Sequence, residues 1–304
     1  RRIVMLSKVA ERVYWTARYL ERIESTARLI SIYDKLLFDL PRNVQLSWYN
    51  LIAINSLQKD FSDRYAVQDE RNVIKFLIGD ESNYSSIISS LKAVRENVRT
   101  TRDVIPSDVW YAINELNLYV KENIQQGINR SKRHEFLNHI IRGCQQILGT
   151  LYSDMPHDAA WTFLRIGRNL ERADMTSRNI DAAMAGVMEA HDIDEAVNTH
   201  SIIWLNLLRS LNADHSYRRS TRQTVTGYGV VDYLVTNEHF PKSIEYCLNA
   251  LIDASNQLSN SKPLTDYLNK IKADIVDNYE PESLGQPLRD DLNELQIHII
   301  NLHK

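Results

Sequence analysis

Apolar residues recur at helical spacing along almost the whole chain. The clearest runs are Ile87, Leu91, Val94 and Val98, followed by Val109, Ile113, Leu116 and Val120. Because residues three and four positions apart lie on one face of an α-helix, these runs predict amphipathic helices. No segment shows the strict alternation of apolar and polar residues that is typical of a half-buried strand. The chain is therefore predicted to be an all-α helical bundle.

Prolines and glycines divide this pattern into about a dozen helices joined by short connections. The breaks fall at Pro41, Gly79-Asp80, Pro106, Gly127, Pro156, Gly227 to Gly229, Pro241, Pro263 and Pro281-Gly285. Pro106 and Pro156 indicate helix starts, because an acidic residue follows each of them closely and proline needs no donor in a first helical turn. Only 9 glycines and 7 prolines occur in 304 residues, which is too few for an all-β chain with many turns.

A stretch near the start of the chain recurs 150 residues later. RYLERIESTARLI, residues 18–30, overlays RNLERADMTSRNI, residues 168–180, with identical Arg, Leu, Glu, Arg, Thr, Arg and Ile. Chance would give roughly one identity over this length, so the match indicates a repeat.

The repeat extends well beyond the charged stretch. Trp48 with the Asn and Leu that follow it aligns with Trp204 and its neighbours, and the offset drifts only from 150 to 157 along the alignment. Internal similarity of this extent predicts a duplication with loop insertions. We therefore expect a single domain over residues 1–304, built from halves at about 5–150 and 156–304. A pseudo-two-fold axis is expected to relate the two halves.

The repeated stretch carries charges on helices that are otherwise apolar on every side. In the first copy Arg18, Glu21 and Arg28 form one stripe, but Tyr14 and Leu36 fall on the same side. A helix that is apolar all round is buried. Buried charges are tolerated when they are paired or when they hold a ligand, so these charges need partners.

Two interpretations of the charged stripe follow directly. In the first, Glu21 of one copy meets Arg168 or Arg172 of the other in a purely structural ion-pair network. In the second, the charges line a polar pocket between the halves. The arginines would then hold a carboxylate or phosphate, and the glutamates an amine or a metal.

A third interpretation takes the acidic pairs as half of a di-metal site. Glu21 with Glu24, and Glu171 with Asp174, stand three residues apart on their helices. The sequence has no E-x-x-H, and neighbouring arginines repel a divalent cation, so we expect no metal and no resident cofactor. The histidines of HEFLNH, residues 134–139, are five apart and point away from each other on a helix.

Other motifs give weaker signals. Lys92, Arg95, Arg99 and Arg102 form a basic stripe that is typical of a solvated helix face. Gly227-Tyr228-Gly229 lacks the further residues of a phosphate-binding loop. The five tryptophans occupy apolar helical positions and are expected in the core.

Composition and charge limit the classes of partner that are expected. The net charge is −3 and the pI about 6.3, so no bulk attraction to nucleic acid or to an anionic membrane is expected. No apolar run approaches the roughly 18 residues that cross a bilayer. Cys144 and Cys247 stand alone, without metal-binding or redox spacing, which favours a reducing, cytoplasmic location.

Five stretches together resemble the bacterial alpha-E family, a helical domain named for its E-R motif. They are MLSKVAERVYWTARYLERIESTARLI, SSIISSLKAVRENVRTTRDVI with VWYAINEL, DAAWTFLRIGRNLERADMTSRNID, WLNLLRSLNA and HFPKSIEYCL. The similarity extends over nearly the whole chain. One departure is Asn169, which stands where members commonly carry an aromatic residue and where the first copy has Tyr19.

The resemblance implies an all-α fold whose biochemical activity is not established. Members of the family are typically encoded beside, or fused to, a circularly permuted ATP-grasp domain and a transglutaminase-like protein. The resemblance thus implies a role in making or modifying a peptide or another amide-linked metabolite. The family's motif residues fall here on Glu21-Arg22, Arg95-Glu96-Asn97, Asp158, Trp161 and Glu171-Arg172.

The leading hypothesis is a non-catalytic binding or accessory module that holds a ligand or an ATP-grasp partner through the Arg/Glu cluster between its halves. The candidate ligand-binding residues are Arg18, Glu21, Arg22, Arg28, Arg168, Glu171, Arg172, Arg178, Arg95, Glu96 and Asp158. The alternative is an enzyme of peptide or amide metabolism in which Glu21 or Glu171 is a general base. No residue is assigned as catalytic.

Overall fold

The computed structural model describes residues 7–39, 46–189, 196–280 and 284–302. Over these residues the protein is all-α, with fourteen α-helices, a 3₁₀ turn, a π-helical turn and no strand. The predicted fold class is therefore confirmed. The breaks expected at Pro41 and Pro281 lie outside the described residues.

The helices follow the order of the predicted breaks. They are α1 (Ser7–Asp39), α2 (Asn50–Ile54), α3 (Gln58–Ser62), α4 (Glu70–Ile78), α5 (Ile87–Arg99), α6 (Ser107–Ile128), α7 (Arg133–Asp154), α8 (Ala159–Glu189), α9 (Ala196–Ser210), α10 (Asp214–Thr221), α11 (Gly227–Thr236), α12 (Ile244–Asn256), α13 (Lys262–Lys272) and α14 (Gln286–Leu302). The 3₁₀ turn (Arg130–Lys132) precedes α7, and the π-helical turn (Ala273–Asp277) follows α13.

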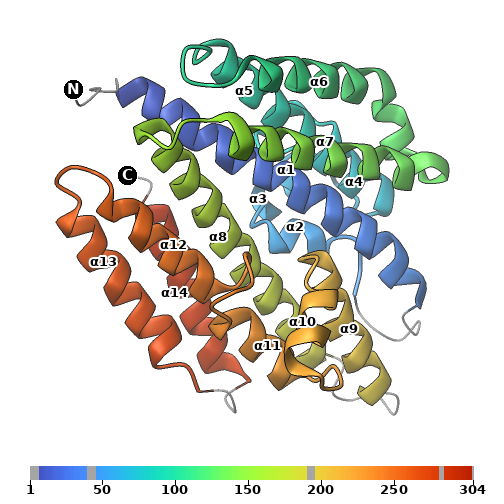
Figure 1. The fold of residues 1–304 in the computed structure, drawn as a ribbon. Helices are drawn as coiled ribbons and strands as arrows, with labels where there is room; N and C mark the ends of the chain where they lie inside the picture. Colours follow the sequence, from blue (N-terminus) through green and yellow to red (C-terminus); the bar gives the residue numbers. More distant parts are fainter. Residues whose placement is uncertain (1–6, 40–45, 190–195, 281–283, 303–304) are drawn as a thin grey trace.

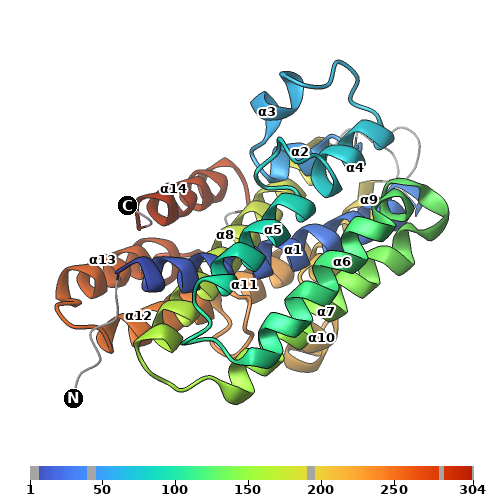
Figure 2. The same cartoon turned by 90° about the horizontal axis from the view of Figure 1, so that it is seen from above.

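Two long helices, α1 and α8, form the centre of the molecule and pack against each other (Figure 1). Helix α1 also packs on α5 and α7, whereas α8 packs on α12 and α14. Seen from above, the α5–α7 group and the α12–α14 group lie apart, with α1 and α8 running between them (Figure 2). The two copies of the charged motif are thus brought together where the central helices meet.

Small residues allow the central helices to approach closely. Gly167 of α8 lies against the backbone carbonyl of Tyr14, and a Cβ atom built on it would collide with that oxygen. Ala17 of α1 is the next neighbour of this position and occupies the equivalent place in the first copy. A backbone oxygen cannot move aside as a flexible side chain can, so the contact requires glycine at position 167.

Side-chain N-caps are present at the starts of α5, α8 and α12. The Ser86 side chain accepts a hydrogen bond from the Ser89 amide at α5, and Ser243 does the same for the Tyr246 amide at α12. The Asp158 carboxylate accepts from the Ala160 amide, 2.9 Å away, at the start of α8. These caps satisfy amides that the first turn of a helix leaves unpaired.

The apolar interior forms two clusters that meet at the central helices. One is built from residues between Val13 and Leu164, and the other from Tyr14 together with residues between Leu170 and Ile299. The last parts of the halves differ, because α6 and α7 have 22 residues each whereas α13 and α14 have 11 and 17. The duplication and its pseudo-two-fold axis stay predictions.

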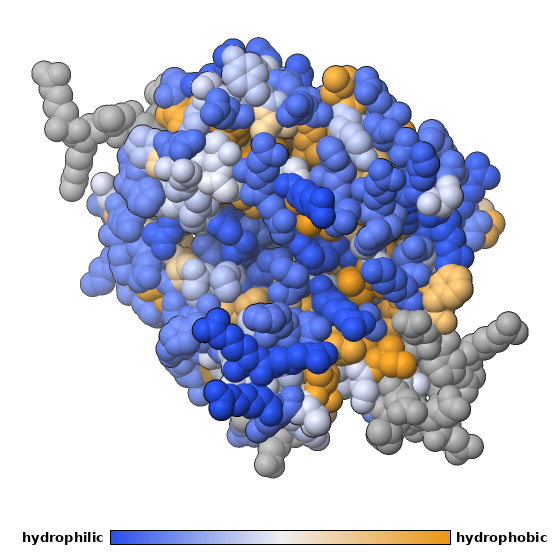
Figure 3. All heavy atoms as spheres, turned by 45° about the vertical axis from the view of Figure 1, so that its right-hand side comes forward, coloured by the Kyte–Doolittle hydropathy of each residue, from blue (hydrophilic) through white to orange (hydrophobic). Residues whose placement is uncertain are grey.

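The surface is mostly polar. The face drawn in Figure 3 is largely hydrophilic, with scattered apolar side chains. Within the described ranges no helix combines the length and the apolarity that crossing a bilayer requires. Cys144 and Cys247 are both buried free thiols, and burial raises the pKa of Cys247 to about 12.

Candidate functional site

The carboxylate of Glu171 is clamped by two arginines of the other half. Arg18 Nε lies 2.7 Å from Oε2, and Arg22 Nε lies 2.6 Å from Oε1. Arg22 Nη2 adds a second bond of 3.1 Å to Oε2, so this pair is bidentate. Arg18 also donates to the hydroxyl of Tyr14 at 2.9 Å. The Glu171 side chain is fully buried.

The reciprocal carboxylate, Glu21, is held by the matching arginines of α8. Arg168 Nε and Arg172 Nη2 each lie 2.9 Å from the same oxygen, Oε1. Arg172 Nη1 also donates to the carbonyl of Pro241 at 3.2 Å, in the loop before α12. The reciprocal ion pairs that the sequence predicted are therefore present across the α1–α8 contact.

Both carboxylates are held in the ionised form. Burial by itself would raise the pKa of Glu171, but the charges of Arg22 and Arg18 outweigh it and lower that pKa to about 2. Burial opposes ionisation of Glu21 as well, and the charges of Arg172 and Arg168 lower its pKa.

A second acidic residue follows one turn later in each copy. Arg28 Nη2 lies 2.9 Å from Glu24 Oε1, and Arg178 Nε lies 2.9 Å from Asp174 Oδ1. Glu24 also accepts from Gln145 Nε2 at 3.3 Å. The contact between α1 and α8 therefore carries ion pairs in two successive turns of both helices, and we call this row of ion pairs the seam.

A pocket of about 710 Å³ opens on the Glu21 side of this seam. Its walls come from α1, α7, α8, α12 and the turns before α10 and α12, and they combine cationic, aromatic and amide side chains. The polar and aromatic lining residues are Glu24, Gln145, Tyr152, Arg165, Arg168, Asn169, Arg172, Asn212, Phe240, Lys242 and Tyr246. Four of these are cationic and one is a carboxylate.

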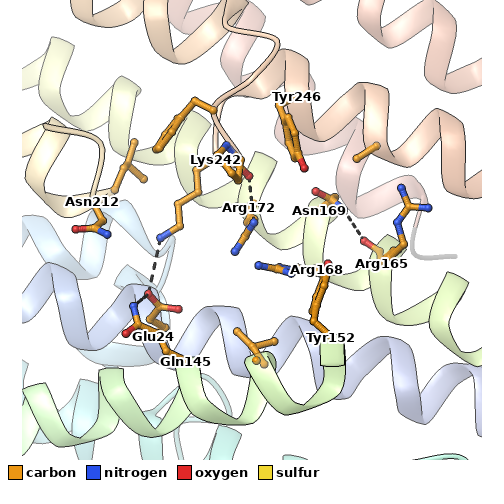
Figure 4. Close-up of a pocket in the computed structure, with 16 residues that line it drawn as sticks. Glu24, Gln145, Tyr152, Arg165, Arg168, Asn169, Arg172, Asn212, Lys242 and Tyr246 are labelled. Carbon is orange, nitrogen blue, oxygen red and sulfur yellow. Dashed lines mark hydrogen bonds and ion pairs between the residues drawn. The ribbon is translucent and has the colours of Figure 1, made fainter. Parts of the chain in front are cut away.

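Hydrogen-bond donors face the pocket from both walls (Figure 4). The Lys242 side chain crosses toward Glu24, where its Nζ stands 3.9 Å from Oε1, while Arg168 and Arg172 approach from α8. Arg172 Nε is buried and finds no hydrogen-bond partner among the described residues. The ring of Tyr152 lies 4.3 Å from the Arg168 guanidinium and supports it by a cation–π contact.

In the first copy of the motif, the positions that align with two residues of the pocket wall carry aromatic rings. Trp15 and Tyr19 stack with their ring centroids 5.2 Å apart, and the guanidinium of Arg22 lies 5.6 Å from the centre of the Tyr19 ring. At an offset of 150 these two positions correspond to Arg165 and Asn169 of the pocket wall. Two substitutions between the copies therefore replace a stacked aromatic pair by polar side chains.

The whole chain matches one protein family. Residues 5–304 fit the family model Alpha-E, described as a predicted alpha-helical domain with a conserved ER motif. The chain belongs to the Alpha-E family. Two of the ER dipeptides of this Alpha-E chain, Glu21-Arg22 and Glu171-Arg172, form the reciprocal ion pairs at its centre.

The curated proteins that match this chain have low sequence identity to it and are much longer. An uncharacterized protein of Mycobacterium bovis and one of Mycobacterium tuberculosis strain CDC 1551 are each 22% identical over 265 residues. One from strain H37Rv is 21% identical over the same length. The match covers 80% of this chain and 29% of each relative, so the chain spans under a third of their length. No solved structure gives a significant match.

Within this Alpha-E chain the predicted site residues separate into groups. Arg168 and Arg172 line the pocket and Glu21 pairs with them. Arg18, Arg22 and Glu171 form the second group of ion pairs and are not part of the pocket lining. Arg28 and Arg178 pair one turn further along.

Three predicted residues lie away from both the pocket lining and the ion pairs between α1 and α8. Arg95 donates to Asn114 Oδ1 at 2.7 Å, and the exposed Glu96 pairs with Arg99 on the surface of α5. Asp158 caps the start of α8. The structure gives each of them a local structural contact, and a ligand-binding role for them stays a prediction.

Several pocket residues were missed by the sequence reasoning. Arg165 stands one turn before Arg168 on the same face of α8, and that spacing was a usable signal. Lys242 lies in the HFPKSIEYCL stretch but outside any charged motif. Only the tertiary structure brings Lys242 and Gln145 to the same pocket as α8.

The di-metal hypothesis finds no donor set. Among the residues that the structure describes, no group of three or more His, Cys, Asp or Glu could hold a metal ion. The carboxylates of the E-x-x-E pair are instead occupied by cations, Glu21 by two arginines and Glu24 by Arg28.

Proposed function

We propose that this Alpha-E chain is a binding module, and that the pocket beside Glu21 holds a ligand bearing a carboxylate or phosphate. The module serves as an accessory partner of an ATP-grasp system that makes or modifies a peptide or an amide-linked metabolite. A cytoplasmic location, suggested by the lone buried cysteines, belongs to the same proposal.

The carrying observation is the imbalance of charge and donors in the pocket. Arg165, Arg168, Arg172 and Lys242 line it against the single carboxylate of Glu24. Within the described part of the chain the Arg165 side chain forms no ion pair, and Arg172 Nε has no partner. An anion with several acceptor oxygens would offset this excess of positive charge and accept hydrogen bonds from the guanidinium and ammonium groups.

The enzyme alternative receives less support. A general base works best when its pKa lies near the operating pH. The pKa of Glu171 is lowered to about 2 and that of Glu21 is also lowered, because each carboxylate is held by two arginines. Such groups are too weakly basic to take up a proton near neutral pH. We therefore favour binding over catalysis.

The partner part of the proposal rests on the family resemblance. The matched segment is 29% of the length of the mycobacterial relatives, so an Alpha-E region there belongs to a much longer chain. An Alpha-E domain would then act together with other domains. A circularly permuted ATP-grasp protein, and with it a transglutaminase-like protein, are the partners we propose.

A thermal-shift titration with citrate and with inorganic phosphate at constant ionic strength tests the anion site. Because a ligand that binds only the native state raises stability, one of the two should raise the Tm by several degrees at saturation. Arg165→Met should weaken this effect, since it removes a pocket charge that has no structural partner. Arg219→Met, on the exposed face of α10, is the matched control and should leave the shift unchanged.

Two outcomes would contradict the proposal. One is an equal Tm response of wild type and Arg165→Met, which would show that the anions act through general salt effects. The other concerns the partner: co-expression with a circularly permuted ATP-grasp protein should give a complex that survives gel filtration, and separate elution of the two proteins would exclude a stable assembly.

A further inference from the structure

Two acidic residues on α1 organise the cations on the pocket side of the seam. Glu21 is bound by Arg168 and Arg172. Glu24, three residues later, is bound by Arg28 and approached by Lys242. Each carboxylate therefore serves two cations, and each group of three side chains carries one surplus positive charge.

The two surplus charges stand at separate points. Residues three apart on a helix have Cβ atoms about 5 to 6 Å from each other, so the groups around Glu21 and Glu24 are neighbours but not superimposed. The cations approach them from different directions, Arg168 and Arg172 from α8 and Lys242 from the loop before α12 (Figure 4). A single small anion cannot lie against both groups equally.

Lys242 is held less tightly by its carboxylate than Arg168 and Arg172 are by theirs. Its Nζ lies 3.9 Å from Glu24 Oε1, which is longer than a hydrogen bond, and its side chain extends across the pocket. Burial lowers the pKa of this amine, although the charges of Glu24 and Glu21 oppose the shift. A second carboxylate close by would stabilise the ammonium form.

The pocket is also large enough for an extended molecule. Its volume of about 710 Å³ lies within the range of sites for small organic ligands and well above the needs of one phosphate group. Tyr152, Phe240 and Tyr246 also line the pocket and offer apolar surface to a short carbon chain.

We infer that the ligand is a short linear molecule with two carboxylates, one bound at Arg168 and Arg172 and the other at Lys242. This inference rests on the proposed anion site and specifies its ligand class. The first carboxylate would accept from guanidinium N–H groups of Arg168 and Arg172, which line the pocket. The second would take Lys242 in place of its long contact with Glu24.

Calorimetric titration with succinate and glutarate, each compared with its monomethyl ester, tests the inference. One charge-assisted hydrogen bond is the difference between diacid and ester, so the better diacid should bind about tenfold more tightly than its ester. Lys242→Met should abolish this preference while the ester still binds. Lys242→Arg, which keeps the charge, should retain it.

Lys272→Met provides the matched control, because Lys272 pairs with Glu245 outside the pocket lining and should not affect the preference. Equal affinity for diacid and ester would overturn the inference while leaving the anion site intact. Tighter binding of methyl phosphate than of either diacid would also overturn it, since both charges would then bind at one point. Binding of none of these probes would refute the proposed function itself.

Discussion

The two ends of the Alpha-E seam contain the same motif and differ in what surrounds it. Around Glu171 the arginines are covered by the stacked rings of Trp15 and Tyr19. Around Glu21 the arginines border a pocket of about 710 Å³. Each carboxylate is bound by two arginines, although those of Glu171 use both oxygens and those of Glu21 share one. The larger difference lies in the neighbouring positions on the same helix faces.

This difference separates a structural role from a binding role within one repeated motif. The Glu171 carboxylate is fully buried, and the arginines that bind it lie against aromatic rings, so we assign it the structural role of joining α1 and α8. At the other end, the arginines that bind Glu21 also border the pocket, so their remaining N–H groups can donate to a bound ligand. The structural and ligand-binding hypotheses are therefore assigned to different copies, and the following experiments test that assignment.

The largest expected effect comes from Glu171→Gln. It leaves Arg18 and Arg22 buried beside a neutral amide, and removing one partner of a buried pair costs about 3 to 5 kcal/mol. Glu21→Gln should cost less, about 1 to 3 kcal/mol, because water in the pocket can solvate its arginines. Urea denaturation of both variants measures the two free energies of unfolding.

Glu96→Gln is the control for this pair. Glu96 is exposed and pairs only with Arg99 at the surface, so its loss should change the free energy of unfolding by less than about 0.5 kcal/mol. Equal losses for Glu171→Gln and Glu21→Gln would show that the two ends of the seam do not differ as proposed.

The pH dependence of stability gives a second, smaller contrast. The pKa of Glu171 is lowered in the folded protein from its ordinary value of 4.5 to about 2, so its contribution to stability is complete above the unfolded value. That contribution is lost progressively as the pH falls from 4.5 toward 2. Denaturation curves between neutral pH and pH about 3 should therefore fall less steeply for Glu171→Gln than for wild type.

Asp174 must be considered in the same titration. Burial raises its pKa, so protonation of Asp174 stabilises the fold at low pH and acts against the loss from Glu171. The charge of Glu171 contributes to that raised pKa, so variant and wild type are compared in an Asp174→Asn background, where position 174 does not titrate. Identical slopes in the two proteins would mean that Glu171 does not carry the acid sensitivity.

Asn169→Tyr has the smallest expected effect on stability and a clear effect on binding. It reproduces in the second copy the residue that covers the seam in the first, Tyr19. The new ring should occupy part of the pocket and weaken anion binding by about tenfold, with the free energy of unfolding changed by less than about 1 kcal/mol. Calorimetric titration with citrate and with inorganic phosphate measures it.

The reverse change, Tyr19→Asn, completes this test. It removes the cation–π contact over Arg22 and should lower the free energy of unfolding by about 1 to 2 kcal/mol without changing anion affinity at the other end. A variant Asn169→Tyr that binds anions as wild type does would show that the ligand lies elsewhere.

The sequence allowed much of the fold to be predicted. Helical spacing gave the all-α class, and the breaks at Pro106, Pro156 and Gly227 coincide with the starts of α6, α8 and α11 to within a few residues. The requirement that buried charges be paired predicted that Glu21 meets Arg168 or Arg172, and it meets both. These features depend on local spacing and on one strong energetic rule.

Which copy of the motif faces a pocket was decided only by the tertiary structure. Residue 169 differs from residue 19 in the sequence, but the meaning of that difference depends on α7, α12 and the loop carrying Lys242, which come from distant parts of the chain. Sequence spacing determines which side chains share a helix face, because that is a property of one helix. The shape and charge of a cavity depend on several helices at once, so they emerge only when those helices pack together.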